Sequence, residues 1–177
     1  MKPKTKVILY IAMSLDGFIA RKNGSIDWLK PFENESEDYG YKTFYKKIGT
    51  VLVGNTTYRQ ALGFSSFPFA EKKCFVFTNS KQRPKHENVN FVKGNVNSFV
   101  KKLKHTEQKP IWLVGGAFTV NEFLKHNLVD EFIITVIPVF LGNGIPLFNG
   151  KQKQKKLKLI KVKKFKQGLV QLIYILL

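Results

Sequence analysis

The sequence predicts an α/β fold with a mostly parallel central sheet and an antiparallel hairpin at the C-terminal end. Apolar runs at residues 50–53, 110–114 and 132–137 show no alternation, which suits strands that are buried on both faces. Helical patterns alternate with these runs, as in chains whose crossover helices connect parallel strands. Residues 155–177 are typical of two strands around a turn at 167–168, which predicts the hairpin.

The first half of the chain predicts two further strand–helix steps. Residues 6–13 form the first buried strand. A helix is predicted over residues 36–47, because its aromatic residues recur at helical spacing. After the next buried strand a second helix opens near residues 54–58, where Thr56 or Thr57 is expected as the N-cap.

The centre of the chain is a strand that breaks at Gly115 and Gly116 and continues as a helix. Lysines interleave with apolar residues at 155–166, and the parity shift near Ile160 predicts a bulged strand. The remaining predicted elements are strands at 73–78 and 89–92, helices at 96–103 and 117–126, and loops at 63–69 and 138–148.

Length and composition indicate a single domain over residues 1–177 with a sizeable core. The 30 Lys and Arg residues against 12 Asp and Glu residues give a formal net charge of +18. Nucleic-acid binding is one explanation of this charge. Ordinary solvent-facing lysine is the preferred one, because arginine, which dominates base recognition, occurs only at positions 21, 59 and 83. Lysines on the final hairpin are likewise expected to coat its wet face.

Cysteine and histidine usage gives little support to metal or nucleophilic chemistry. Cys74 is the only cysteine and lies in an apolar run, so a buried inert thiol is expected. The three histidines, at positions 86, 105 and 126, are far apart among polar residues, and no metal site is predicted. The apolar N-terminal and C-terminal runs are too short for a signal peptide or a membrane span, so a cytoplasmic location is expected.

Small polar residues follow several of the predicted strands. Ligands bind at the carboxyl ends of strands in open α/β sheets, so these residues should meet at one edge. Glycines allow close approach to the backbone, and helix N-termini favour phosphate. The dinucleotide and P-loop motifs are absent, yet the set fits a dinucleotide with an extra phosphate near Lys81 and Arg83.

Several segments in order resemble the dihydrofolate reductase-like superfamily. They are residues 11–20 with Asp27 and Trp28, residues 53–58, residues 114–116, residues 128–131 and residues 138–142. More specifically, they resemble the reductase domain of bifunctional riboflavin-biosynthesis deaminase–reductases. The resemblance implies a three-layer αβα sandwich and NADPH as hydride donor.

The resemblance also assigns the cofactor residues. Ala12 and Ile19 would border the nicotinamide, and residues 54–57 would hold the pyrophosphate. Thr78, Asn79 and Ser80, with Lys81 nearby, would take the adenosine ribose and its 2′-phosphate. The cofactor-binding set is Ala12, Ile19, Gly54, Asn55, Thr56, Thr57, Thr78, Asn79, Ser80, Lys81, Gly115, Gly116, Ala117, Phe118 and Thr119.

The catalytic carboxyl is expected to be Asp27 or Glu33, either of which could donate a proton or hold an amidine. Such a role needs a partly buried acid with a raised pKa. Thr135 matches a threonine that partners this carboxyl in folate enzymes. The other substrate-binding candidates are Asp16, also a turn former, and Trp28 and Phe44, which are pocket walls or core residues.

Some positions depart from the family pattern. Asn55 stands where the superfamily has an arginine, and Val114 stands where the riboflavin-type reductases have a glutamate. No arginine accompanies residues 142–146, the counterpart of their substrate phosphate loop.

The resulting prediction is an NADPH-dependent reductase of a small heterocycle. The substrate would be a pterin such as dihydrofolate, or 5-amino-6-(5-phosphoribosylamino)uracil. The alternatives are a basic nucleic-acid-binding module and a nucleotide-binding member without turnover. The exposed hairpin suggests a homodimer. Nucleic acid and membranes are not expected partners.

Overall fold

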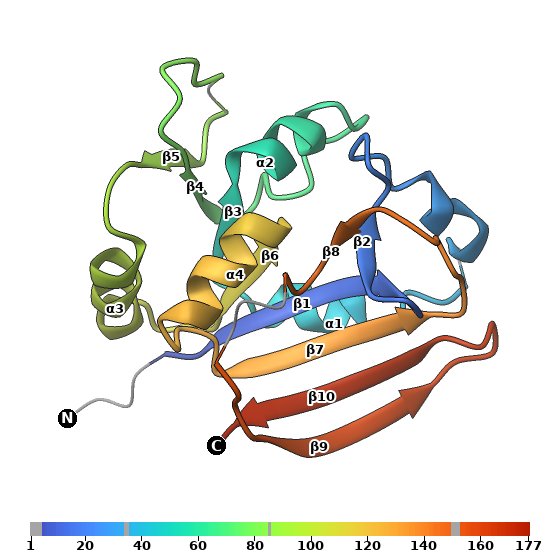
Figure 1. Cartoon of the computed structure of the whole chain (residues 1–177). Coiled ribbons are helices and arrows are strands. Elements are labelled where there is room, and N and C mark those ends of the chain that lie inside the picture. Colours follow the sequence, from blue (N-terminus) through green and yellow to red (C-terminus); the bar gives the residue numbers. More distant parts are fainter. Residues whose placement is uncertain (1–4, 34–35, 85, 150–152) are drawn as a thin grey trace.

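The computed structural model describes residues 5–33, 36–84, 86–149 and 153–177. Its main sheet has eight strands in the order β5-β4-β3-β6-β1-β7-β10-β9 (Figure 1). All the strand pairs from β5 to β7 are parallel, and β10 and β9 add antiparallel pairs. The strands are β1 (Val7–Ser14), β3 (Thr50–Gly54), β4 (Lys73–Phe77), β5 (Val89–Val92), β6 (Ile111–Gly115), β7 (Glu131–Ile137), β9 (Leu157–Lys164) and β10 (Val170–Leu176).

Helices cover both faces of the sheet. The helices are α1 (Tyr41–Lys47), α2 (Asn55–Leu62), α3 (Val96–Thr106) and α4 (Ala117–Lys125), with a 3₁₀ helix η1 (Asp27–Phe32) before them. Leu9, Leu52 and Leu113 pack with α3 and α4 on one face, the near side of Figure 1. Val51 and Trp112 pack with α1 and α2 on the other face. Adjacent residues of one strand are therefore buried on opposite faces, which explains the apolar runs without alternation.

The predicted fold class and C-terminal hairpin are confirmed. β9 and β10 pair antiparallel, and the register shift falls where predicted: Ile173 faces Lys161 whereas Tyr174 faces Leu159. Ile160 is therefore the extra residue of a bulge. The predicted loop 138–148 contains a short strand, β8 (Ile145–Pro146), which pairs with β2 (Phe18–Ala20) in a second small sheet.

Two local predictions were wrong. The helix expected over residues 36–47 begins only at Tyr41. Gly40 has a φ of +82°, a left-handed conformation that sets the helix start. The N-cap of α2 is Gly54 rather than Thr56 or Thr57, because helical conformation begins directly at the end of β3.

Candidate active site

A large cleft lies at the carboxyl ends of the parallel strands, the edge at which the sequence places its polar residues. Its volume is about 1280 Å³. It spans the ends of β1, β3, β4, β6 and β7 and reaches the loops before α1. The predicted site residues that line it are Ala12, Ile19, Glu33, Gly54, Asn55, Thr56, Thr57, Thr78, Asn79, Gly116, Ala117, Phe118, Thr119 and Thr135.

Two helix N-termini meet at the middle of the cleft. The N-caps of α2 and α4 are Gly54 and Gly116, and neither helix has a side-chain cap. A Cβ added at Gly54 would lie 2.4 Å from Thr119 Oγ1, and one added at Gly116 would lie 3.0 Å from Thr57 Oγ1. Only glycine permits this approach, which brings two sets of uncapped backbone N–H groups together. Such a pair of N-termini suits a pyrophosphate.

Asn55, the first residue of α2, also lines the cleft at this point. Its Oδ1 atom is buried and has no hydrogen-bond partner among the described residues. Buried polar atoms are normally paired, so a ligand group or a water molecule is expected to complete this one.

The end of the cleft beyond β4 is built on a self-supporting turn. Thr78 and Asn79 line the cleft, whereas Ser80 and Lys81 do not. The N–H of Ser80 donates to Thr78 Oγ1 at 3.0 Å, and Arg83 Nε donates to the Ser80 carbonyl at 3.1 Å. Ser80, which was expected to contact the ribose, is therefore not part of the cleft wall. The neighbouring Lys81 is exposed to solvent.

Aromatic side chains form the wall at the opposite end of the cleft. Tyr10, Tyr39, Tyr41 and Trp112 all line it. Burial raises the pKa of both Tyr10 and Tyr41 to about 12, so these hydroxyls stay protonated donors at neutral pH. Sequence reasoning missed all four residues, because aromatic residues in strands and helices usually indicate core packing. Phe44 does not line the cleft but stacks on Tyr10 with ring centroids 4.2 Å apart.

One polar residue of the cleft wall, Thr135, is paired with a buried amide. Thr135 Oγ1 accepts a hydrogen bond of 3.1 Å from Gln171 Nε2, which also donates to the Tyr39 carbonyl at 3.4 Å. Gln171 is 2% exposed. The resemblance implies a carboxyl partner for Thr135. Among the described residues, its hydrogen-bond partner is instead the side-chain amide of Gln171. Gln171 was missed because it lies in the last predicted strand, far along the chain.

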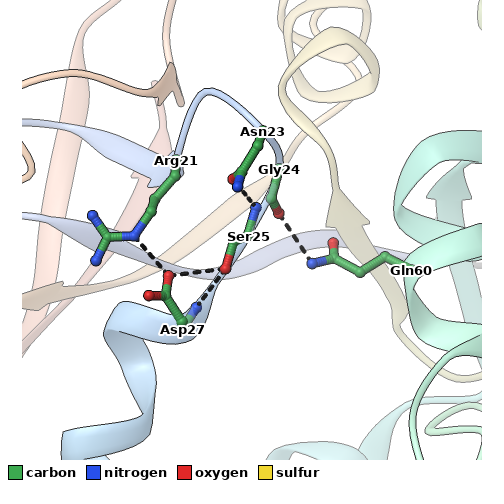
Figure 2. A network of polar contacts seen from close by, with 6 residues as sticks. All are labelled: Arg21, Asn23, Gly24, Ser25, Asp27 and Gln60. Atoms are coloured by element: carbon green, nitrogen blue, oxygen red, sulfur yellow. Dashed lines mark hydrogen bonds and ion pairs between the residues drawn. The ribbon is translucent and has the colours of Figure 1, made fainter.

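The structure separates the two candidate carboxyls. Glu33 lines the cleft, whereas Asp27 lies on the surface outside it. Asp27 Oδ1 accepts from Arg21 Nε at 2.7 Å and from Ser25 Oγ at 2.9 Å (Figure 2). These bonds, first that of Arg21, lower the pKa of Asp27 below its usual value. The expectation that a catalytic acid at this position has a raised pKa is therefore wrong. Glu37 and Asp38, which were not predicted, line the cleft with Glu33.

Asp16 and Trp28 have structural positions outside the cleft lining. Asp16 accepts from Ser14 Oγ and from the backbone N–H groups of Leu141 and Gly142, so it fixes the turn that it was expected to form. Desolvation works to raise its pKa, but these hydrogen bonds outweigh it and lower the pKa overall. Trp28 is buried with Ile137 and Leu169, which fits core packing rather than a pocket wall.

The loop at residues 21–25 contacts the C-terminal half of α2 at the cleft wall. Gln60 Nε2 donates to the Gly24 carbonyl at 3.1 Å, and both residues line the cleft (Figure 2). Asn23 Oδ1 and Ser25 Oγ tie the loop to itself and to Asp27. The loop is therefore held to α2 mainly through a single side-chain hydrogen bond.

Other features bear on the excluded chemistries. Burial raises the pKa of the Cys74 thiol to about 12, as expected for an inert cysteine. The described residues contain no cluster of side chains that could hold a metal ion. Within the same residues, no helix has both the length and the apolar character of a membrane span.

The sheet order, the helices on both faces and the cleft at the strand ends define a protein with a dihydrofolate reductase-like fold. Dihydrofolate reductase from Enterococcus faecalis, solved with NADP(H), has a TM-score of 0.65 and is 15% identical, covering 97% of this chain and 96% of that one. Residues 67–171, more than half of the chain, match the family described as the RibD C-terminal domain. The chain belongs to this family.

Two further comparisons cover nearly the whole chain. The uncharacterized protein YwjB of Bacillus subtilis (strain 168) is 47% identical over 171 residues, which cover 96% of this chain and 97% of that protein. A putative riboflavin biosynthesis protein from Shewanella sp. PV-4 has a TM-score of 0.88 at 30% identity. That comparison covers 98% of this chain and 99% of the other. The likeness to these proteins thus extends over the cleft and the C-terminal hairpin.

Proposed function

We propose that this protein is an NADPH-dependent reductase of a small heterocycle. The observation that carries the proposal is the pair of uncapped helix N-termini at Gly54 and Gly116, which both line a cleft of about 1280 Å³. Family membership and the likeness to an NADP(H)-bound dihydrofolate reductase support the same cofactor.

The cleft residues suggest how the cofactor would lie. The backbone N–H groups that open α2 and α4 would bind the pyrophosphate, and Thr78 and Asn79 would contact the adenosine ribose. Ala12 and Ile19 would border the nicotinamide, which supplies a hydride when bound. Lys81 and Arg83, outside the cleft wall, would reach the 2′-phosphate from solvent.

The protein's own residues would then position the substrate and move a proton. The aromatic wall of Tyr10, Tyr41 and Trp112 would hold a flat ring against the nicotinamide and exclude water. Reduction of a C=N or C=O bond also requires a proton at the nitrogen or oxygen. Glu33 is the proposed donor, directly or through water, because it lines the cleft and Asp27 does not.

Fluorescence titration with NADPH tests the proposal first, with binding expected in roughly the micromolar range. Consumption of NADPH is then measured with dihydrofolate and with 5-amino-6-(5-phosphoribosylamino)uracil. Absence of binding at millimolar NADPH would refute the cofactor. Salt-sensitive retention on DNA together with that absence would favour a nucleic-acid-binding module. Binding without turnover of any heterocycle would indicate a nucleotide-binding protein that is not a reductase.

A further inference from the structure

The charge of the cleft is opposite to that of the protein. The chain carries 30 Lys and Arg residues, yet none of the described residues that line the cleft is Lys, Arg or His. Four of them are acidic: Glu33, Glu37, Asp38 and Glu122. Glu33, Glu37 and Asp38 precede Tyr39 and Tyr41 of the aromatic wall in the sequence, at the end of the cleft where a substrate would lie beside the nicotinamide.

Backbone N–H groups that could replace a cation at this end are already bound. At the start of α1, Asp38 accepts from the N–H of Gly40 at 3.0 Å and from that of Lys42 at 2.7 Å. A carboxylate of the chain thus occupies the place where an anion would contact this turn. The two N–H donors lower the pKa of Asp38, Lys42 first, which keeps the carboxyl ionised at neutral pH.

In the loop between β7 and β8, two backbone N–H groups are likewise bound by a carboxylate of the chain. Asp16 accepts from the N–H of Leu141 at 3.1 Å and from that of Gly142 at 2.7 Å. Glycine-rich loops with free N–H groups are a common phosphate cradle. Here the amides of Leu141 and Gly142 bind an internal carboxylate instead, so these two N–H groups are not free for a phosphate.

We propose that the substrate of this cleft is a flat heterocycle without a phosphate group. The inference rests on the proposed reductase function and names its substrate class. A phosphate carries about −1.5 to −2 charge at pH 7. At this end of the cleft it would approach acidic side chains, with no Lys, Arg or His among the described lining residues to offset them and with the amides beside Asp38 and Asp16 already bound. The aromatic wall instead offers stacking, and the hydroxyl groups of Tyr10, Tyr41 and Thr135 offer neutral hydrogen bonds, which suit a ring with amino and carbonyl groups.

One lysine approaches this region from the C-terminal hairpin. Lys163 Nζ lies 3.4 Å from the position of a Cβ added at Gly40. Neither Gly40 nor Lys163 lines the cleft, so this lysine adds no cation to the cleft wall.

The test compares two ligands that differ only in the phosphate. The protein loaded with NADP⁺, which cannot supply a hydride, is titrated calorimetrically with 5-amino-6-(5-phosphoribosylamino)uracil and with its phosphate-free riboside. The riboside is expected to bind at least about tenfold more tightly, since like charges in a binding site disfavour the phosphorylated compound. Equal or tighter binding of the phosphorylated compound would overturn the inference, and so would failure of both compounds to bind at millimolar concentration.

Variants assign the preference to the acidic side chains. Glu33→Gln and Glu37→Gln, combined in one protein, keep the hydrogen-bonding shape and should reduce the preference severalfold. Glu87→Gln makes the same charge change at an exposed position outside the cleft and should leave it unchanged. An unchanged preference in the double variant would contradict the electrostatic explanation. NADPH titration of every variant shows separately whether the cofactor site, and with it the proposed function, remains intact.

Discussion

Three aspartates near the cleft show how hydrogen bonds decide what a carboxyl can do. Asp16, Asp27 and Asp38 each accept from groups of the chain, and in each case these donors lower the pKa. A carboxyl held in this way stays ionised near neutral pH and is a poor proton donor. The sequence places Asp27 beside Trp28. It could not show that Asp27 binds Arg21 and Ser25 on the surface, outside the cleft.

We predict that Asp27→Asn leaves the turnover rate and its pH dependence nearly unchanged, whereas Glu33→Gln slows turnover by roughly ten- to a hundredfold. The reason is that, of these two carboxyls, only Glu33 lines the cleft. Steady-state rates measured from acid to alkaline pH provide the check. A large effect of Asp27→Asn with a normal Glu33→Gln protein would reverse the assignment.

The ion pair of Asp27 also has a defined pH window. Its folded pKa lies below the usual value of 3.8, so its stabilising contribution is present above that value and disappears as the pH falls through the folded pKa. The small difference in melting temperature between wild type and Asp27→Asn should therefore be seen at neutral pH. It should vanish as the pH falls through the folded pKa, which lies below 3.8, and a difference that grows in acid would show that the sign is wrong.

Cys74 provides a second prediction at the level of a single residue. It is fully buried in β4, and burial raises its pKa to about 12. Reaction with a thiol reagent at pH 8 should be slow in the native protein and fast in denaturant, because both access and thiolate are lacking in the fold. Rapid native labelling would contradict the described packing of β4.

Single residues were predictable from sequence where backbone chemistry selects them. Gly116 was found from the glycine pair that follows a buried strand, and Gly54 from the family resemblance; a Cβ at either position would lie close to a threonine hydroxyl. Tyr10, Tyr41 and Gln171 were not found, because the same residue types serve equally well in a core. Only the fold brings β1, α1 and β10 together at one end of the cleft.

Among the elements, the junctions of β3 with α2 and of β6 with α4 are the most constrained. Gly54→Ala is expected to destabilise the protein by about 1–3 kcal/mol and to weaken NADPH binding, because the new Cβ would lie 2.4 Å from Thr119 Oγ1. Thr119→Ala removes that oxygen, so the double variant should recover much of the stability. Chemical denaturation of the four proteins measures the coupling, and strict additivity would exclude the proposed contact.

The loop at residues 21–25 is a second element with a testable role. Gln60→Glu removes the N–H donor to the Gly24 carbonyl. Loss of one such hydrogen bond should raise the dissociation constant of NADPH about two- to tenfold. Gln108→Glu, which makes the same charge change at an exposed position, serves as the control. Equal NADPH affinity in both variants would show that the loop does not hold the cofactor.

Elements were predictable to the extent that apolar patterning determines them. The buried strands and the bulged hairpin follow from periodicity, and the structure confirms them. The start of α1 could not be read in this way. The left-handed Gly40 and the amide bonds of Asp38 override the aromatic spacing that suggested an earlier start.

At the scale of the whole molecule, the outer strand β9 combines lysines with exposed apolar residues. Leu159, Ile160 and Val162 are 48%, 52% and 46% exposed. The sequence suggested that two copies pair through this hairpin. If they do, sedimentation should show a dimer that tightens with salt, because salt screens the repulsion between chains of charge +18. Val162→Lys should give a monomer and Leu15→Lys, at an exposed site elsewhere, should not. A wild-type monomer at high salt and high concentration would refute the pairing.

The arrangement of the cleft across the whole sheet leads to one decisive structure determination. Crystals of the protein with NADPH should show the pyrophosphate on the backbone N–H groups that open α2 and α4, with the nicotinamide beside Ala12 and Ile19 and the aromatic end vacant for substrate. NADPH bound elsewhere, or no NADPH bound in crystals soaked at millimolar concentration, would contradict the account.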